Sequence, residues 1–355
     1  MKTNLLHRSF GKLIILFFAL SFYGVTTLAF ADKFNEESSD PTEKLDVGKI
    51  IMDHVLDSHE WHLWDGPFGT IPLPVILYSE QNGFTVFMSS KFEHGNASYQ
   101  GYKINEGHIV AQDGHKFFDI SITKTVTAML ISMIILCFVF ISVARTYTRN
   151  PNTSPKGMQS LLEPIIIFVR DEVAKPAIGK ERYEKYLPYL LTVFFFIWIN
   201  NTMGLIPLFP GGANVTGNIS ITLVIALFTF VITTINTNKH YWIHVFNMPG
   251  VPWWLKFPVP LMPVVEFFGI ISKPAVLMLR LFANITAGHI VILVFISLIF
   301  IFGEINMLAG YGVSIIAIMF SVALSFLELL VAFLQAYVFT LLSALYFGMA
   351  KVEHH

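Results

Sequence analysis

The sequence has few charges, a single cysteine and no common nucleotide-binding loop. Only 13% of its 355 residues are charged, whereas about a quarter of the residues of a soluble domain are charged. Cys137 alone permits neither a disulfide framework nor a cysteine-based metal site within the chain. The pattern G-x-x-x-x-G-K-[ST] does not occur, which excludes a phosphate-binding loop of that type. We expect no cofactor, no metal, no nucleic-acid partner and no catalytic activity of the chain on its own.

Apolar residues are abundant instead, at 54% of the chain, and many are gathered in long runs. Five runs can cross roughly 30 Å of hydrocarbon at about 1.5 Å per residue, and they cover 125–144, 187–206, 219–237, 259–302 and 307–350. The last two would each reach roughly 65 Å if straight, so they either break into pairs of shorter spans or lie strongly tilted. The sequence therefore predicts an all-α membrane protein with a membrane domain over 121–355.

The N-terminus has the pattern of a secretory signal peptide over 1–31. Basic residues precede an apolar core at 13–28, and the A-F-A sequence that ends at Ala31 is a small-residue cleavage pattern. The mature chain would then begin at Asp32. The alternative is an uncleaved first membrane span, and either interpretation predicts that the next segment is exported.

The exported extension at 32–120 is polar and contains a β-hairpin pattern. Two β-type runs at 71–79 and 84–90 are separated by E-Q-N-G, which is typical of a hairpin turn. In D-S-H-E-W-H-L-W, His59 and His62 lie three residues apart but lack a convincing second ligand pair, so we favour solvated histidines over a metal site.

The basic residues of the loops predict the orientation. The loop between the first two spans contains Arg145, Arg149, Lys156, Arg170, Lys175, Lys180, Arg182 and Lys185. The loops at 207–218 and 303–306 contain no Lys or Arg. Because basic residues concentrate in cytoplasmic loops, we expect the 145–186 loop and the C-terminus to be cytoplasmic and the extension to be periplasmic. Within that loop, the apolar half of 160–179 followed by charges predicts an amphipathic helix at the membrane interface.

Several polar side chains fall inside the first long apolar run. At about 100° per residue, Glu266, Lys273 and Arg280 share one face of a helix, and Asn284 stays within about 40° of Arg280. His289 lies about 180° around the helix from Arg280 and roughly 13 Å further along it. The arginine and the histidine are therefore expected to serve different surfaces.

The second long run carries Glu328 and Gln335 on one helix face. If the two long helices pack antiparallel, residues at equal depth have residue numbers with a nearly constant sum. Arg280 with Gln335 and His289 with Glu328 meet this condition almost equally well. The spacing therefore predicts an outer His/Glu pair and a mid-membrane Arg/Gln pair, provided that no kink intervenes.

The chemistry of these side chains suggests a proton path. A histidine beside a carboxylate can exchange protons near neutral pH, whereas Arg280 keeps its proton and is suited to attracting a carboxylate. Structural alternatives remain: Glu266 and Lys273 can extend their charges to the interface, and Gln335 and Asn284 can join helices by hydrogen bonds. Because no carboxylate of the chain matches Arg280 in depth and face, a carboxylate of another subunit is the natural partner.

The membrane region resembles subunit a of the F-type ATP synthase. The resemblance rests on S-K-P-A-V-L-M-L-R-L-F-A-N-I-T-A-G-H-I-V-I at 272–292, on F-L-Q-A-Y-V-F-T-L-L-S-A-L-Y-F-G-M-A at 333–350 and on F-V-R-D-E-V-A-K-P-A-I-G at 168–179. Weaker support comes from M-G-L-I-P at 203–207. These segments cover much of 150–351, and the R-L-F-A-N-x-x-A-G-H run is highly specific.

The resemblance implies roles for the polar residues. Arg280 would be the essential stator arginine that faces the carboxylate of the rotating c-ring, and the two long helices would be a tilted pair along that rotor. His289 and Glu328 would line the outer proton half-channel, with Gln335 and Asn284 near the arginine. In many bacterial members Glu follows A-G and His lies on the last helix, so the pair is exchanged here.

The resemblance further implies a multi-pass protein of a bacterial inner membrane, in contact with lipid, the c-ring and peripheral stalk subunits. Glu266 would lie toward the cytoplasmic exit path, and no small-molecule substrate is implied besides the ion. Whether that ion is H⁺ or Na⁺ depends on the c subunit, although we favour H⁺. The resemblance says nothing about the extension at 32–120.

Two other classes of protein compete with this interpretation. A secondary transporter can use an intramembrane arginine to bind an anionic substrate, but the sequence shows no repeated pair of interrupted helices. An intramembrane metalloenzyme needs an H-E-x-x-H-type ligand set within a span, and His289 is the only histidine in the expected spans.

Overall fold

The structure is a computed structural model that describes residues 47–62, 69–81, 83–95, 97–105, 107–150, 154–206, 211–238, 242 and 261–350. The expected signal peptide and its cleavage site lie outside the described residues. The chain divides into two compact units, which are described separately. Unit 1 comprises residues up to 131, 202–215 and 286–330, and unit 2 comprises 132–201, 216–285 and 331 onward.

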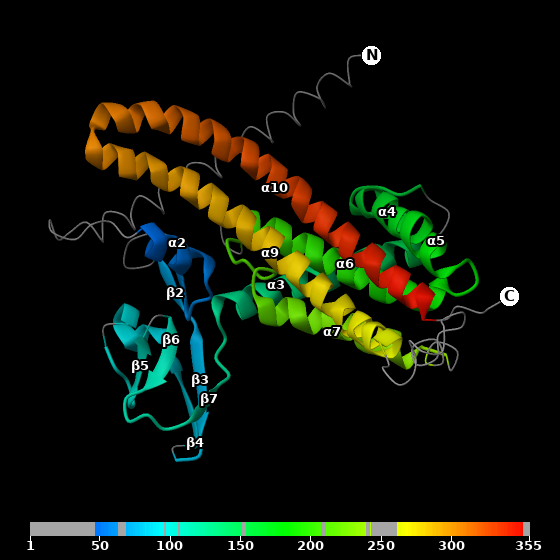
Figure 1. The fold of residues 1–355 in the computed structure, drawn as a ribbon, viewed down its shortest axis with the longest axis horizontal. Coiled ribbons are helices and arrows are strands. Elements are labelled where there is room, and N and C mark those ends of the chain that lie inside the picture. Colours follow the sequence, from blue (N-terminus) through cyan, green and yellow to red (C-terminus); the bar gives the residue numbers. More distant parts are fainter. Residues whose placement is uncertain are drawn as a thin grey trace. The chain divides into compact units, whose positions relative to one another are not determined.

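The membrane region is built from helices, as expected. Four helices are long and apolar enough to cross a bilayer, namely α3 (Lys124–Arg149), α6 (Tyr183–Leu205), α9 (Leu261–Ile305) and α10 (Met307–Met349). A shorter apolar helix, α7, covers Ile219–Ile235 and begins where the side chain of Asn218 accepts a hydrogen bond from the backbone N–H of Ser220. The long runs do not break into pairs, because α9 and α10 are each one continuous helix (Figure 1).

A very short turn joins α9 to α10. Asn306 alone separates them, and its side-chain oxygen accepts a hydrogen bond from the backbone N–H of Leu308 at 2.9 Å. A Cβ atom at Gly310 would lie only 2.8 Å from the Cα atom of Gly303. Glycine at 310 therefore lets the two helices meet closely at the turn, and they continue antiparallel with stacked rings of Phe295 and Phe320.

The expected interface segment is helical and also packs against the spans. It consists of α4 (Met158–Phe168), a π-helical turn η2 (Val169–Ala174) and α5 (Lys175–Ile178). Within unit 2, the fully buried side chains of Val169, Val173 and Ala174 join apolar clusters with α6 and α10. A Cβ atom at Gly348 of α10 would lie 2.0 Å from the carbonyl oxygen of Ala177, so α5 approaches α10 at a position that only glycine permits.

The described part of 32–120, which the sequence predicts to be exported and which we call the exported region for that reason, contains more β-structure than the sequence predicts. The expected hairpin is present as β3 (Pro74–Ser79) and β4 (Gly83–Met88), paired from Pro74↔Met88 to Ser79↔Gly83. A third strand, β7 (Phe117–Asp119), pairs antiparallel with β3, which gives the order β4-β3-β7. The smaller elements are α2 (Val47–Val55), β1 (Glu60–His62), β2 (Thr70–Pro72), η1 (Ser89–Gly95), β5 (Tyr102–Asn105) and β6 (His108–Ala111).

The elements of unit 1 are joined by a small core and by one helix contact. Val75, Leu77 and Phe87 of the three-stranded sheet pack with Tyr102 and Ile109 of the β5–β6 hairpin. Separately, α2 packs through Ile51 on Ile292, Leu293 and Ile296 of α9. Within unit 1, this region therefore contacts the long helix α9 directly.

Candidate functional site

His289 of α9 and Glu328 of α10 form an ion-pair contact inside the helical hairpin. The Nδ1 atom of His289 lies 3.1 Å from the Oε1 atom of Glu328, and only 4% of the Glu328 side chain is exposed. A Cβ atom at Gly288 would lie 2.8 Å from the same oxygen. The glycine that precedes the histidine therefore makes room for the carboxylate. The spacing of the sequence predicted this pairing, but it did not predict the role of Gly288.

The surroundings of the pair include more buried polar atoms. Neither the carboxylate oxygens of Glu328 nor the hydroxyl oxygens of Thr286 and Ser321 have a hydrogen-bond partner within the described part of the chain. Ser321 and Glu328 are seven residues apart, so they share a face of α10 about 10 Å apart along its axis. On α6, a Cβ atom at Gly204 would lie 3.8 Å from the Nε2 atom of His289. Buried polar atoms of this kind usually bind ordered water.

Arg280 lies on an exposed face of α9 in unit 2. The exposed positions that follow it on this face are small or polar, namely Ala283, Asn284 and Ala287. No hydrogen bond or ion pair joins Arg280 to any other residue that the structure describes. An intramembrane guanidinium without a partner is costly, and the described residues supply none for Arg280.

The sequence predicts that Arg280 and Gln335 lie together at mid-membrane depth, but within the described residues no hydrogen bond or ion pair joins their side chains. Gln335 is 8% exposed, and no hydrogen bond or ion pair joins it to another described residue. The charge of Arg280 instead acts on Tyr346 of α10, which sequence reasoning missed. The aromatic ring of Tyr346 also lies 5.6 Å from the Nζ atom of Lys273.

A second group of polar residues lies in unit 2 on the other side of Arg280 along α9. The charge of Glu266 acts on Lys273, as their shared helix face suggests. Lys273 and Tyr346 line a cavity together with Thr229 and Thr233 of α7. The threonines escaped sequence reasoning because hydroxyls inside an apolar helix commonly bond to the helix backbone, as that of Thr233 does to Thr229.

The described residues contain no group of three or more His, Cys, Asp and Glu side chains that could hold a metal ion. The His59 ring contacts Asp119 at 3.4 Å, and the side chain of His62 lies outside the described residues.

The helices and these side chains define an integral membrane protein with ionisable groups inside its spans. Comparison with known proteins is more specific. The family model described as ATP synthase A chain matches residues 126–348. A second model, described as Domain of unknown function (DUF8433), matches residues 50–128 and so covers most of the exported region that the structure describes.

Individual relatives agree with the family model. The chain is 39% identical to "ATP synthase subunit a" of Chlorobium phaeobacteroides, over 87% of this chain and 77% of the relative. It is 44% identical to "ATP synthase subunit a 2" of Prosthecochloris aestuarii, over 86% and 80% of the two chains. It is 41% identical to "ATP synthase subunit a" of Myxococcus xanthus, over 67% and 75%. The chain belongs to the ATP synthase A chain family.

Proposed function

We propose that this chain is the proton-translocating, non-catalytic membrane subunit of an F-type ATP synthase. The observation that carries the proposal is Arg280, which is exposed on α9 and has no partner among the described residues. The matched relatives, whose names describe them as ATP synthase subunit a, support it. Protons would pass through two half-channels that meet at a carboxylate of the c-ring, and ATP chemistry would occur elsewhere in the complex.

The outer half-channel is assigned to the surroundings of His289 and Glu328. Ser321 continues the buried polar face of α10 away from the membrane middle, toward the turn at Asn306. Water held by these oxygens can carry a proton to Glu328, because each water both donates and accepts a hydrogen bond. The contact with His289 lets the pair pass the proton on while the hairpin excludes bulk solvent.

Arg280 is assigned to the rotor interface. Its guanidinium cannot release a proton under physiological conditions, so it attracts an ionised carboxylate but does not carry protons across the gap. Ala283 and Ala287 on the same face are small enough to let a rotor helix approach closely. Asn284 adds a hydrogen-bonding group beside the arginine, and we assign Gln335 of the neighbouring helix to the same region.

The cytoplasmic half-channel is assigned to the polar residues of unit 2. The cavity lined by Thr229, Thr233, Lys273 and Tyr346 offers hydroxyl groups on one side of Arg280, with Glu266 further along the helix. A proton released from the c-ring would leave by this route. The positive charge of Lys273 would discourage other cations from entering.

The remaining assignments concern placement in the cell. We place the chain in a bacterial inner membrane, with the exported region periplasmic, the C-terminus cytoplasmic and α4 to α5 at the cytoplasmic interface. The c-ring and the peripheral stalk are its partners. The basic residues between α3 and α6 support this orientation.

The decisive experiment is ATP-driven proton pumping in inverted membrane vesicles, with the parent chain compared with Arg280→Ala. Val276→Ala is a matched control, because Val276 is also exposed on α9 but carries no charge. We expect Arg280→Ala to abolish pumping while the complex still assembles and its head still hydrolyses ATP, and the control to pump normally. Unchanged pumping by Arg280→Ala would make the arginine structural and refute the proposed mechanism.

A further inference from the structure

One face of the β4-β3-β7 sheet is apolar and exposed. Strand geometry places even-numbered positions on this face, and odd-numbered Val75, Leu77 and Phe87 point into the core with the β5–β6 hairpin. The exposed fractions are 71% for Phe84 and Phe118, 65% for Val86 and 57% for Ile120. Scattered exposed apolar residues are common, but a contiguous row across three strands marks a surface that contacts something apolar. We call this surface the apolar sheet face; it consists of Ile76, Tyr78, Phe84, Val86, Met88, Phe118 and Ile120.

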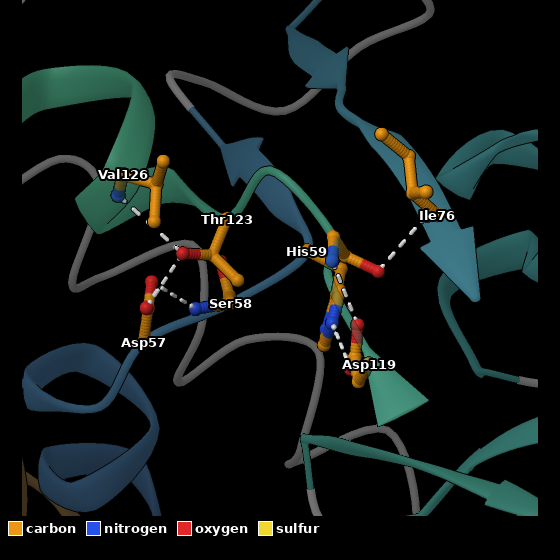
Figure 2. Close-up of polar contacts among 8 residues, drawn as sticks. Asp57, Ser58, His59, Ile76, Asp119, Thr123 and Val126 are labelled. Atoms are coloured by element: carbon orange, nitrogen blue, oxygen red, sulfur yellow. Dashed lines mark hydrogen bonds and ion pairs between the residues drawn. The ribbon is translucent and has the colours of Figure 1, made fainter. Parts of the chain in front are cut away.

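The segment between α2 and β1 is bound directly to the first turn of α3. The Asp57 carboxylate accepts hydrogen bonds from the Thr123 hydroxyl at 2.7 Å and from the backbone N–H of Thr125 at 3.0 Å. The backbone N–H of Lys124 donates to the Ser58 carbonyl oxygen at 2.9 Å. Figure 2 shows Asp57 beneath the start of the helix, with Thr123 between the carboxylate and Val126. These hydrogen bonds fix the segment before β1 to the start of α3.

The strand pairing also continues almost to the helix. Beyond β7, the backbone N–H of Ile120 donates to Ile76 and that of Ile122 donates to Pro74, at 2.9 and 3.0 Å. Only four residue steps separate Ile120 from Lys124, the first residue of α3, so they lie at most about 14 Å apart. Figure 1 shows the β5–β6 hairpin on one side of the sheet and the chain leaving toward α3 on the other.

We propose that the apolar sheet face lies on the outer surface of the lipid bilayer. Phe84, Phe118 and Tyr78 have the aromatic character that favours the boundary between headgroups and acyl chains. No strand position of this face is acidic, and Lys116 at the start of the row supplies a positive charge for lipid phosphates. The exported region therefore braces the first span at the membrane surface. This inference concerns a surface that the proposed proton path does not use.

The test places nitroxide spin labels on the full chain in bilayers of phosphatidylethanolamine and phosphatidylglycerol. Cys137 is replaced by Ser, and single cysteines are introduced as Val86→Cys, Phe118→Cys and, as a matched control, Val110→Cys. Val110 is 45% exposed but belongs to β6, in the hairpin on the opposite side of the sheet. Collisions are measured with oxygen, which concentrates in lipid, and with a water-soluble nickel chelate.

We expect the oxygen-to-nickel collision ratio to be several-fold higher at positions 86 and 118 than at position 110. Equal ratios at all three positions would place the apolar sheet face in water and overturn the proposal. Protection from both reagents at 86 and 118 would also overturn it, because a second copy or the segment 1–46 would then cover the face. If either label prevents insertion, Met88→Cys and Ile120→Cys provide the same comparison.

Discussion

At the scale of single residues, side-chain size matters as much as charge. Gly288 leaves the space that the Glu328 carboxylate occupies, since a Cβ atom there would approach it to 2.8 Å. Beside Arg280, the exposed residues of α9 at 283 and 287 are alanines, whose short side chains project little from the helix. Proton transfer needs contacts near 3 Å or a bridging water, so an added methyl group can matter as much as a lost charge.

The first prediction concerns the pair of His289 and Glu328. Glu328→Gln replaces the titratable carboxylate with an amide that cannot take up a proton, and we expect ATP-driven pumping to fall at least about a hundredfold, the lower end of the range for loss of a positioned acid–base group. Exchanging the partners by His289→Glu together with Glu328→His keeps a carboxylate and an imidazole in contact at the same depth. The exchanged chain should recover most of the pumping that either single change loses.

A control separates this effect from general damage to α10. Leu329→Gln introduces the same amide at the next residue, which is 46% exposed and outside the pair. It should assemble and pump far better than Glu328→Gln. If the exchanged chain pumps no better than its single variants while assembling normally, the two residues do not act as one pair.

At the scale of secondary-structure elements, polar side-chain contacts position the ends of strands and helices. Asp171 in η2 accepts hydrogen bonds from the guanidinium of Arg170 and from the Lys175 ammonium, and these contacts lower the pKa of the Asp171 carboxyl. In the exported region, the Asp119 carboxylate of β7 contacts the ring of buried His59 at 3.4 Å and accepts from the backbone N–H of Ser121 at 2.9 Å. Such contacts fix the ends of elements that hydrophobic periodicity alone leaves undefined.

The second prediction is a pH dependence in that exported region. Burial raises the pKa of Asp119, but its contacts with His59 and Ser121 outweigh burial, so the pKa lies below the ordinary value of 3.8. A depressed carboxyl pKa stabilises the fold above the unfolded-state pKa, and this contribution is lost as pH falls through the lower folded-state pKa. Asp119→Asn should therefore destabilise the β4-β3-β7 sheet at pH 7, and the difference from the parent should shrink as the pH falls through the lowered pKa of the Asp119 carboxyl.

Hydrogen exchange of the β3 and β7 amides in the full chain measures this difference. Parent and variant are compared at each pH, so the intrinsic pH dependence of exchange cancels. Glu80→Gln, at an exposed position of the β3–β4 turn, is the control and should leave exchange unchanged. A difference between parent and Asp119→Asn that is equal at pH 7 and pH 3 would show that the charge of Asp119 is irrelevant to stability.

At the scale of the whole molecule, the sequence could predict a feature where the length of an apolar run or of a connection left few possible arrangements of the chain. The lengths of the apolar runs indicated the long helices. Because Asn306 alone connects α9 to α10, the two helices can pack antiparallel in very few registers, and His289 could therefore be paired with Glu328 from the sequence. The contact of Asp57 with the start of α3 joins segments more than 60 residues apart, and hydrophobic periodicity along the chain gives no information about such a contact. The close approach of Ala177 to Gly348 depends likewise on tertiary packing. The pairing of β7 with β3 was missed because about forty residues separate the two strands, and local turn signals reveal only adjacent pairings.

The last prediction concerns how the chain meets its rotor. If the exposed face of α9 that carries Arg280 adjoins the c-ring, a cysteine at Ala283, one turn further along that face, should cross-link to a cysteine beside the c-ring carboxylate. Cys137, an exposed residue of α3, is replaced by Ser in the test chain but retained in a parallel control, where it should not react with the same c-ring cysteine. Because rotation brings each c subunit past α9 in turn, cross-linking should also stop ATP-driven pumping, and reduction of the disulfide should restore it. Cross-linking from Cys137 with none from Ala283→Cys would instead place the rotor against α3 and leave Arg280 without the partner proposed for it.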